Sequence, residues 1–193
     1  MRGRAVLAAA VLATAGPALA ACSTAVAGPP PGHGRPIEVV AAENMWGSVA
    51  AQVGGNRVEV TSIIDNPAAD PHDYEPTAVD GRAIATADVV LSNGIGYDRW
   101  AQQLAAANPD PHRVDLTVGG IVGVRDGGNP HRWYDPADVF AVARALAATF
   151  GRVDPAGGAY FERQLATFET TGTETYRGLV AQIRSRLDRK SVV

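Results

Sequence analysis

Two patterns of hydrophobic residues alternate along residues 37–187: short continuous apolar runs and apolar positions repeated at helical spacing. Short runs of apolar and β-branched residues bounded by turn residues are typical of strands buried in a sheet. These runs span residues 37–42, 58–64, 88–92 and 113–116. Other segments repeat their apolar positions with helical spacing, at residues 45–53, 78–86, 97–107 and 136–150. The alternation predicts an α/β fold in which a parallel four-stranded sheet is flanked by helices on both faces.

Polar residues mark where several of these helices begin. Asn44 precedes the first helix and Thr77 precedes the second, and both are favoured cap residues. Asp80 lies three positions after Thr77, where its carboxylate completes a capping box. Asp135 precedes a proline at the start of the fourth helix, a position where the missing proline N–H costs nothing.

A further helical segment is predicted at residues 153–187. Asp154 precedes a proline, as Asp135 does, and Gly172 interrupts the segment, so a kink is expected there. This helix follows a complete small domain at residues 37–152. We therefore expect it to link that domain to another one.

The first 36 residues differ from the rest of the chain. Residues 1–21 join an arginine-containing start to an apolar run that is too short to cross a bilayer, which is typical of a signal peptide. Leu19-Ala20-Ala21-Cys22 resembles the lipobox of bacterial lipoproteins. That resemblance implies cleavage before Cys22, acylation of its thiol and anchoring to the outer face of the membrane. The alternative is a general secretory signal with an unrelated cysteine. Residues 22–36 are rich in proline and glycine and are predicted to be a flexible tether.

Composition supports a globular domain. Of 193 residues, 46% are hydrophobic and 19% are charged, which excludes a disordered, collagen-like or coiled-coil chain. A net charge of -3 argues against a nucleic-acid-binding protein. With a single cysteine, Cys22, no intramolecular disulfide can form.

Two of the four histidines are candidate metal ligands. His72 and His131 each follow a proline, in the loops after the second and fourth predicted strands, so both should lie at the carboxyl edge of the sheet. Neutral imidazole is the commonest protein ligand for divalent transition metals. The alternative for such histidines is loop hydrogen bonding or plain surface exposure. His33 falls in the tether, and His112 is expected on the surface, in a turn before a strand.

Four segments resemble one family of metal receptors. Residues 70–77 (Asp-Pro-His-Asp-Tyr-Glu-Pro-Thr) and 129–136 (Asn-Pro-His-Arg-Trp-Tyr-Asp-Pro) resemble the metal-ligand segments of cluster A-I solute-binding proteins. Residues 39–55 and 87–94 resemble other parts of that family's first lobe. These are zinc- and manganese-binding lipoproteins of ABC importers, with two α/β lobes joined by a long helix and the metal held between the lobes.

The resemblance implies a function and a set of partners. His72 and His131 would be the first two metal ligands, and the other ligands would come from a carboxy-terminal lobe that this sequence lacks. The protein would capture zinc or manganese outside the membrane as a lipid-anchored monomer and deliver it to an ABC permease and its ATPase. Two ligands do not decide which metal is bound, and a structural zinc site usually has four. We therefore expect this chain to bind metal weakly.

Three acidic residues are secondary candidates. Glu43 ends the first strand and could face the cleft, although compensation of a helix N-terminus is the favoured interpretation. Asp73 and Asp135 could orient the imidazoles, although Asp135 is better explained as a helix cap.

Other functions fit the sequence less well. A metallohydrolase would need an open coordination position and a general base, and the sequence contains neither His-Glu-x-x-His nor a nucleophile elbow. No enzymatic activity is therefore expected. A surface adhesin or a metal-storage lipoprotein on the same scaffold stays open as an alternative.

The last six residues are unlike the rest. Lys190 is the one lysine in a chain that otherwise uses arginine, and residues 188–193 resemble a translated sequencing adapter. We expect the natural sequence to depart from this one near Leu187, with residues 188–193 as an artefactual tail.

Overall fold

Four parallel strands form one sheet in the computed structural model. The structure describes residues 34–66 and 68–190, with the backbone alone at residues 188–190. They are β1 (Ile37–Glu43), β2 (Val58–Ile64), β3 (Val89–Ser92) and β4 (Val114–Thr117). Their order across the sheet is β2-β1-β3-β4. The predicted α/β fold with a four-stranded parallel sheet is therefore confirmed. The predicted signal peptide, Cys22, most of the tether and the last three residues lie outside the described part.

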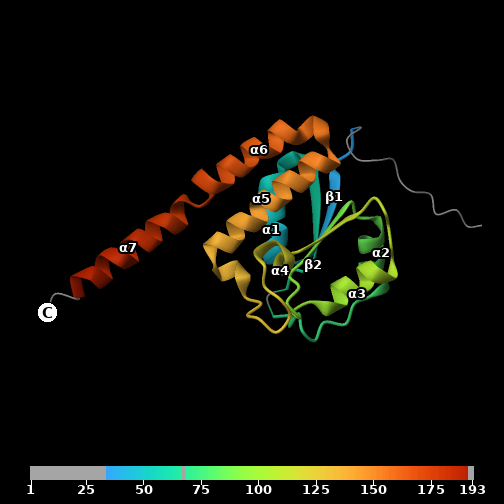
Figure 1. Ribbon diagram of the computed structural model, residues 1–193, viewed down its shortest axis with the longest axis horizontal. Helices are drawn as coiled ribbons and strands as arrows, with labels where there is room; N and C mark the ends of the chain where they lie inside the picture. Colours follow the sequence, from blue (N-terminus) through green and yellow to red (C-terminus); the bar gives the residue numbers. More distant parts are fainter. Residues whose placement is uncertain (1–33, 67, 191–193) are drawn as a thin grey trace, which may run out of the picture.

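Helices cover both faces of the sheet (Figure 1). On one face lie α1 (Asn44–Gly54), α5 (Pro136–Val153) and α6 (Gly158–Thr167), and on the other lie α2 (Ala78–Thr86) and α3 (Arg99–Ala107). A short helix, α4 (Val118–Val122), follows β4 and was not predicted, because its five residues are too few to show a period. Single 3₁₀ turns span Gly55–Arg57, Arg132–Tyr134 and Pro155–Gly157.

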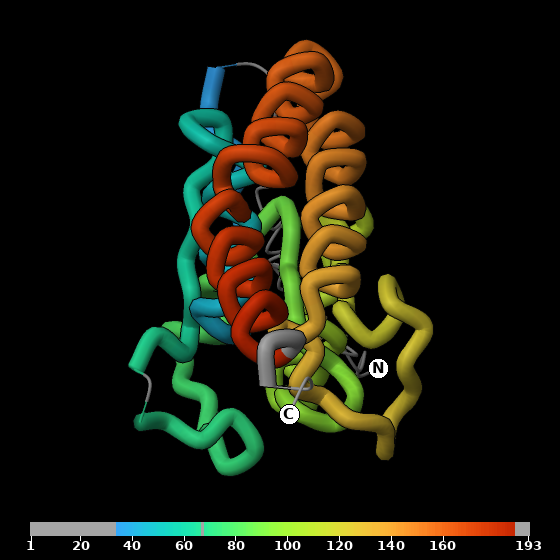
Figure 2. Tube along the Cα trace, turned by 90° about the vertical axis from the view of Figure 1, so that its left-hand side faces the viewer, coloured from blue at the N-terminus to red at the C-terminus, as the bar shows by residue number. Residues whose placement is uncertain are grey.

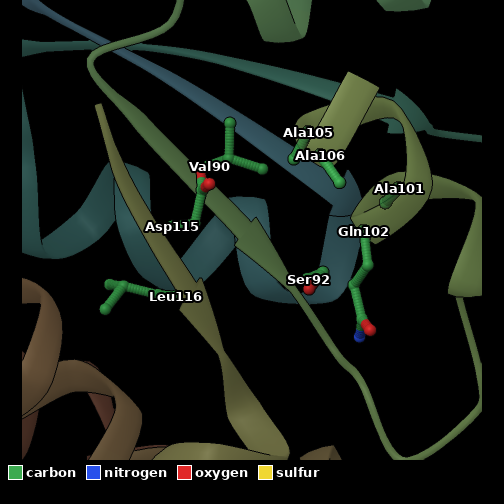
Figure 3. A pocket seen from close by; sticks show the side chains of 8 residues that line it. All are labelled: Val90, Ser92, Ala101, Gln102, Ala105, Ala106, Asp115 and Leu116. Atoms are coloured by element: carbon green, nitrogen blue, oxygen red, sulfur yellow. The ribbon is translucent and has the colours of Figure 1, made fainter. Parts of the chain in front are cut away.

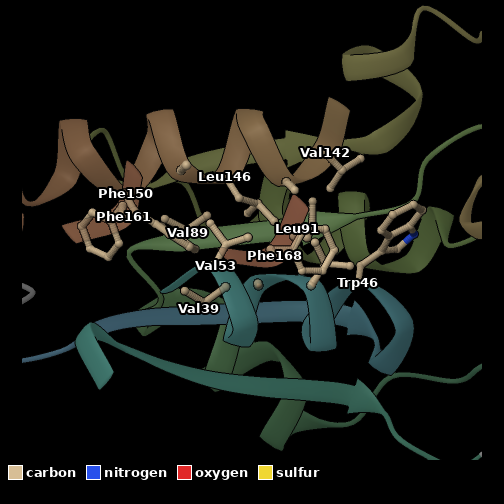
Figure 4. Close-up of a cluster of buried hydrophobic side chains, with 14 of the residues drawn as sticks. Val39, Trp46, Val53, Val89, Leu91, Val142, Leu146, Phe150, Phe161 and Phe168 are labelled. Carbon is tan, nitrogen blue, oxygen red and sulfur yellow. The ribbon is translucent and has the colours of Figure 1, made fainter. Parts of the chain in front are cut away.

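Alternate residues of the central strands point to opposite faces of the sheet, and each face packs against an apolar layer. Val39, Val89 and Leu91 face the larger core, where they pack with Leu146 and Phe150 of α5 (Figure 4). Their neighbours Val40 and Val90 face the smaller core beneath α2 and α3. Because both faces are apolar, these strands appear in the sequence as continuous hydrophobic runs.

The predicted caps are partly confirmed. The Thr77 hydroxyl accepts hydrogen bonds from the backbone N–H groups of Val79 (3.2 Å) and Asp80 (3.4 Å), and Asp80 accepts one from the backbone N–H of Thr77 (2.7 Å). Asp135 accepts one from the backbone N–H of Ala137 at 3.0 Å.

Two other predicted caps are wrong. Asn44 is already the first residue of α1, and Glu43 occupies its cap position without a side-chain hydrogen bond. Asp154 does not cap the helix after it, because its carboxylate accepts from the guanidinium of Arg57 at 2.7 Å. This ion pair competes with the local cap, and it joins residues 97 positions apart in the sequence, so the residues next to Asp154 do not indicate it.

We expect Thr77→Ala to lower the free energy of unfolding by about 1 kcal/mol, because the first turn of α2 loses its hydrogen-bond acceptor. Urea denaturation measures the change. Thr175→Ala, at an exposed position, is the matched control and should change stability by less than about 0.5 kcal/mol. Equal effects of the two substitutions would contradict the capping role.

The segment after α5 is helical but not continuous. α6 lies beside α5 (Figure 2), a π-helix follows at Phe168–Gly172, and α7 (Glu174–Lys190) extends away from the sheet (Figure 1). The interruption falls at Gly172, where a kink was expected. α7 continues to Lys190, past the predicted helix end at Leu187. No helix in the described part is long and apolar enough to cross a membrane.

Candidate metal centre

Loops from all four strands meet at the carboxyl edge of the sheet. Glu43 ends β1, the loop carrying His72 follows β2, a tight turn at residues 93–98 follows β3, and the loop carrying His131 comes after β4 and α4. Parallel strands all end on the same side, so polar residues distant in sequence converge there.

Each candidate histidine is held by the same local turn. The side chain of Asp70 accepts a hydrogen bond from the backbone N–H of His72 at 2.9 Å, and Asn129 accepts one from that of His131 at 3.0 Å. In both cases a proline lies between the two residues and fixes the backbone further. Both imidazoles are exposed on rigid supports.

The ring of Tyr97 lies between the two histidines. Its centroid is 4.7 Å from that of His72 and 6.1 Å from that of His131, both in edge-to-face arrangements. Tyr97 itself is buried. The ring centroid of Trp133 lies 5.3 Å from that of Tyr97 and 5.2 Å from that of His131. The structure thus brings the two predicted ligands to a single aromatic ring.

A hydrogen bond selects the tautomer of His131. Its Nδ1 lies 2.8 Å from the side-chain oxygen of Asn129, an acceptor, so Nδ1 carries the proton and donates it. The Nε2 atom then keeps its lone pair and is available to a metal ion. Such an outer partner is the usual companion of a metal-ligating histidine.

Asn93 ties the His131 loop to the centre of the sheet. It is fully buried, its side-chain N–H donates to the carbonyl of Pro130 at 3.1 Å, and its side-chain oxygen accepts from the indole N–H of Trp46 at 2.9 Å. The backbone beside His131 is therefore fixed from β3 and α1 together.

The turn at residues 93–98 is strained and needs support. Ile95 has a φ of 59°, in the left-handed region that a β-branched residue rarely adopts, between two glycines that adopt it freely. The buried carboxylate of Asp98 accepts hydrogen bonds from the backbone N–H groups of Asn93 (2.6 Å) and Gly94 (2.8 Å). These two bonds hold the turn that presents Tyr97 to the histidines.

Glu43 lies beneath this turn and is almost wholly buried, with 1% of its surface exposed. Burial, together with the negative charge of Asp98, raises the pKa of Glu43 to about 10, so its carboxyl is protonated at neutral pH. Burial also raises the pKa of Tyr97, with smaller contributions from Glu43 and other acids nearby. Its side chain makes no cap hydrogen bond to α1, and a neutral carboxyl does not compensate a helix N-terminus, so the structure does not support that interpretation of Glu43.

The remaining sequence-predicted residues lie elsewhere or act differently. Asp73 is exposed, and in the described part of the chain no hydrogen bond joins it to either imidazole. Asp135 caps α5, as expected. His112 is exposed, as expected, and repeats the same turn, with its backbone N–H donating to Asp110 at 2.8 Å. It precedes β4, however, so it lies at the opposite edge of the sheet from His72 and His131.

Sequence reasoning did not single out Tyr97, Asn93, Asp98 or Asn129. For Asn129 a signal was present, since an Asp or Asn two residues before a proline-preceded histidine occurs at 70–72, 110–112 and 129–131. The other three act through contacts between distant segments.

The described residues do not complete a metal site by themselves. No group of three or more His, Cys, Asp or Glu side chains in residues 34–66 and 68–190 is arranged to hold an ion. A separate hollow of about 210 Å³ lies on the sheet beside α3 and β4 (Figure 3). Most of the residues that line it are small or apolar, such as Val90 and Ala101, but Gln102 and Asp115 line it too. It is distinct from the histidine loops.

Comparison with known proteins gives the family. The family model for the zinc-uptake complex component A, periplasmic, matches residues 39–193. The chain belongs to this family. The manganese-binding lipoprotein MntA of Halalkalibacterium halodurans is 30% identical over 127 residues, which are 64% of this chain and 42% of MntA. The iron-binding protein YfeA of Yersinia pestis is 27% identical over 161 residues, 80% of this chain and 50% of YfeA.

Solved structures have the same fold. The solute-binding protein FpvC of Pseudomonas aeruginosa, in complex with Ni²⁺, aligns with a TM-score of 0.65 and 25% identity over 79% of this chain and 55% of FpvC. Fe(III)-bound YtgA of Chlamydia trachomatis aligns with a TM-score of 0.62 and 22% identity over 73% and 52%. The chain spans about half the length of the curated relatives it matches. The resemblance seen in the sequence is confirmed, and these relatives are named as metal-binding proteins.

Proposed function

We propose that this chain is the metal-capturing lobe of an ABC-importer receptor for a divalent transition metal, zinc or manganese, with His72 and His131 as its first two ligands. The observation that carries the proposal is the convergence of these two histidines on the ring of Tyr97. Imidazole nitrogens suit the first-row divalent metals, and His131 presents Nε2 with its lone pair free.

The proposal extends to the parts of the protein around this lobe. Residues 37–152 would form the lobe and residues 153–187 the helix that links it to a second lobe, which would supply the other ligands. This agrees with the length of the relatives, of which the chain spans about half. Acylation at Cys22 would anchor a monomer at the outer face of the membrane, where it would pass its metal to a permease driven by an ATPase. The ion is cargo in this scheme, and the protein is not an enzyme.

The geometry explains how the lobe would hold its cargo. The two histidine turns are fixed by Asp70 and Asn129, so little loop entropy is lost when an ion binds. Two neutral nitrogens leave the ion's other positions to water, so the ion stays exchangeable until further ligands close on it.

Isothermal titration of this chain with Zn²⁺ and with Mn²⁺ tests the proposal. We expect weak binding, which is abolished by His72→Ala or by His131→Ala. His112→Ala is the matched control, because His112 lies in the same kind of turn at the other edge of the sheet, and it should leave binding unchanged. His33, outside the described residues, is replaced by Ala in every sample. A tight stoichiometric complex, or equal loss with His112→Ala, would contradict the proposal.

The tautomer of His131 leads to a second expected result. Asn129→Ala removes the acceptor of the Nδ1–H group and leaves the imidazole free to rotate, so zinc affinity should fall by about tenfold or more. The same titration measures it. Asn66→Ala removes a comparable turn hydrogen bond, to the backbone N–H of Ala68 at 3.0 Å, and should leave affinity unchanged. An unchanged zinc affinity in Asn129→Ala would show that Asn129 does not orient the imidazole of His131 for metal binding.

A further inference from the structure

Two acidic side chains are buried together below the histidine loops. Glu43 is 1% exposed and Asp98 is fully buried. β1 pairs with β3 in parallel, Ala41 with Leu91, so Glu43 at the end of β1 lies beside Asn93, whose backbone N–H donates to Asp98. If Glu43 were ionised, neither of its oxygens would have a donor to accept from within residues 34–66 and 68–190. If it is protonated, its O–H can donate to Asp98, and the contact becomes favourable.

The surroundings favour a single negative charge on this pair. In the part of the chain that the structure describes, the charged group that acts on Glu43 is Asp98, and Tyr97 is the other titratable group in electrostatic contact with it. Asp98 is the member that keeps the charge, because it accepts two short hydrogen bonds from backbone N–H groups. Two buried carboxylates without a cation cannot both ionise at low cost.

The pair is connected to both histidines through the strained turn. Asp98 holds the backbone of Asn93 and Gly94, Asn93 in turn holds Pro130 next to His131, and Tyr97 contacts the rings of both His72 and His131. A shift in Asp98 would therefore displace groups that contact both imidazoles. Among the described residues, neither Glu43 nor Asp98 itself makes a hydrogen bond or ion pair with a histidine.

We propose that Glu43 and Asp98 share one proton and act as a positioning pair, which holds the turn at residues 93–98 against both histidine loops. Glu43 donates, Asp98 accepts and caps the turn, and the turn places Tyr97 and Asn93. This role rests on the proposed function, in which His72 and His131, the residues that the pair positions, are metal ligands. The shared proton and the histidine positions can be measured without metal.

Infrared spectroscopy of the metal-free protein tests the shared proton. A protonated carboxyl absorbs at a higher C=O frequency than a carboxylate, and at neutral pH the exposed acids are ionised. We expect one such band in the wild-type protein and its loss in Glu43→Gln. Glu59→Gln, at an exposed position on β2, should keep the band. Absence of the band from the wild type, or its persistence in Glu43→Gln, would overturn the proposal.

Imidazole NMR of metal-free variants tests the positioning role. Gln and Leu both approximate the size of Glu, but only Gln keeps an N–H group that can donate to Asp98. We expect Glu43→Leu to shift the ring signals of His72 and His131 together, while Glu43→Gln leaves them near their wild-type positions and His112 is unchanged in both. A merely structural role would lower stability in both variants without this pattern.

The outcomes separate this inference from the proposed function. If His72 and His131 fail to bind metal while the infrared band and the NMR pattern appear, the positioning pair stands and the metal function falls. If His72 and His131 signals do not respond to Glu43→Leu, the positioning role is overturned whatever the metal result. Should Glu43→Leu fail to fold, the infrared comparison of wild type with Glu43→Gln still decides whether the proton is shared.

Discussion

Asp98→Asn is expected to lower the free energy of unfolding by about 3 kcal/mol, a large effect for a substitution that changes one atom. The Asp98 carboxylate accepts from two backbone N–H groups, at 2.6 and 2.8 Å, in a fully buried position. An Asn side chain has a single acceptor oxygen, so one of these donors would face an NH₂ group. The turn around Ile95, which is held in an unfavourable conformation, would lose its main support.

Urea denaturation at neutral pH measures this loss. Asp126→Asn is the matched control, because Asp126 is exposed and its contact with Arg99, at 3.5 Å, is a surface ion pair. That control should change stability by less than about 0.5 kcal/mol. A loss below about 1 kcal/mol in Asp98→Asn would show that the turn does not depend on its carboxylate.

Glu43→Gln is expected to make the protein progressively more stable than the wild type as the pH rises. The ordinary pKa of Glu43, 4.5, is raised to about 10 in the folded protein by burial and by Asp98. Above pH 4.5 the unfolded chain releases this proton while the folded protein keeps it, so wild-type stability is lost as the pH rises toward 10. The slope for one such group is about 1.4 kcal/mol per pH unit.

The difference between the two proteins isolates the pair formed by Glu43 and Asp98. Every titrating residue outside the Glu43–Asp98 pair is common to both proteins, so the difference in free energy of unfolding between Glu43→Gln and wild type reports on the pair. It should grow by up to about 4 kcal/mol from pH 5 to pH 8. Urea denaturation at each pH unit provides the curve. Parallel stability curves for the two proteins would mean that Glu43 is already ionised in the folded state.

Much of the fold could be predicted because its signals are local. The runs that form β1 and β2, the capping box of Thr77 and the Asp135 cap each depend on residues within a few positions of one another. The location of the candidate site followed from one further rule, that parallel strands end at a common edge.

The interior of the site could not be predicted in this way. Glu43 follows an apolar strand and precedes a helix, a pattern that indicates an exposed acid at a helix start. It is buried because the turn at residues 93–98 covers it, and that contact joins segments far apart in sequence. The positions of Tyr97 and Asn93 likewise depend on how the loops after β2, β3 and β4 pack together.

The three Asp- or Asn-Pro-His turns show the limit of motif reading. His72, His112 and His131 are held by nearly identical hydrogen bonds from their backbone N–H groups, at 2.9, 2.8 and 3.0 Å. Their different surroundings come from topology, because His112 precedes a strand whereas the other two lie in loops that follow one. The local turn therefore fixes the backbone of each histidine, and its place relative to the strands determines whether its ring lies near a second histidine.

A comparison of these three histidines also provides the most direct test of the proposed metal centre. In a ¹⁵N-labelled chain with His33 replaced by Ala, the imidazole ring signals of His72, His112 and His131 are followed by NMR in one sample as Zn²⁺ is added. We expect the Nε2 signal of His131 and the ring signals of His72 to change together along one binding curve, while the signals of His112 stay in place. A response of His112 equal to theirs, or a response of His131 without His72, would contradict a shared metal site.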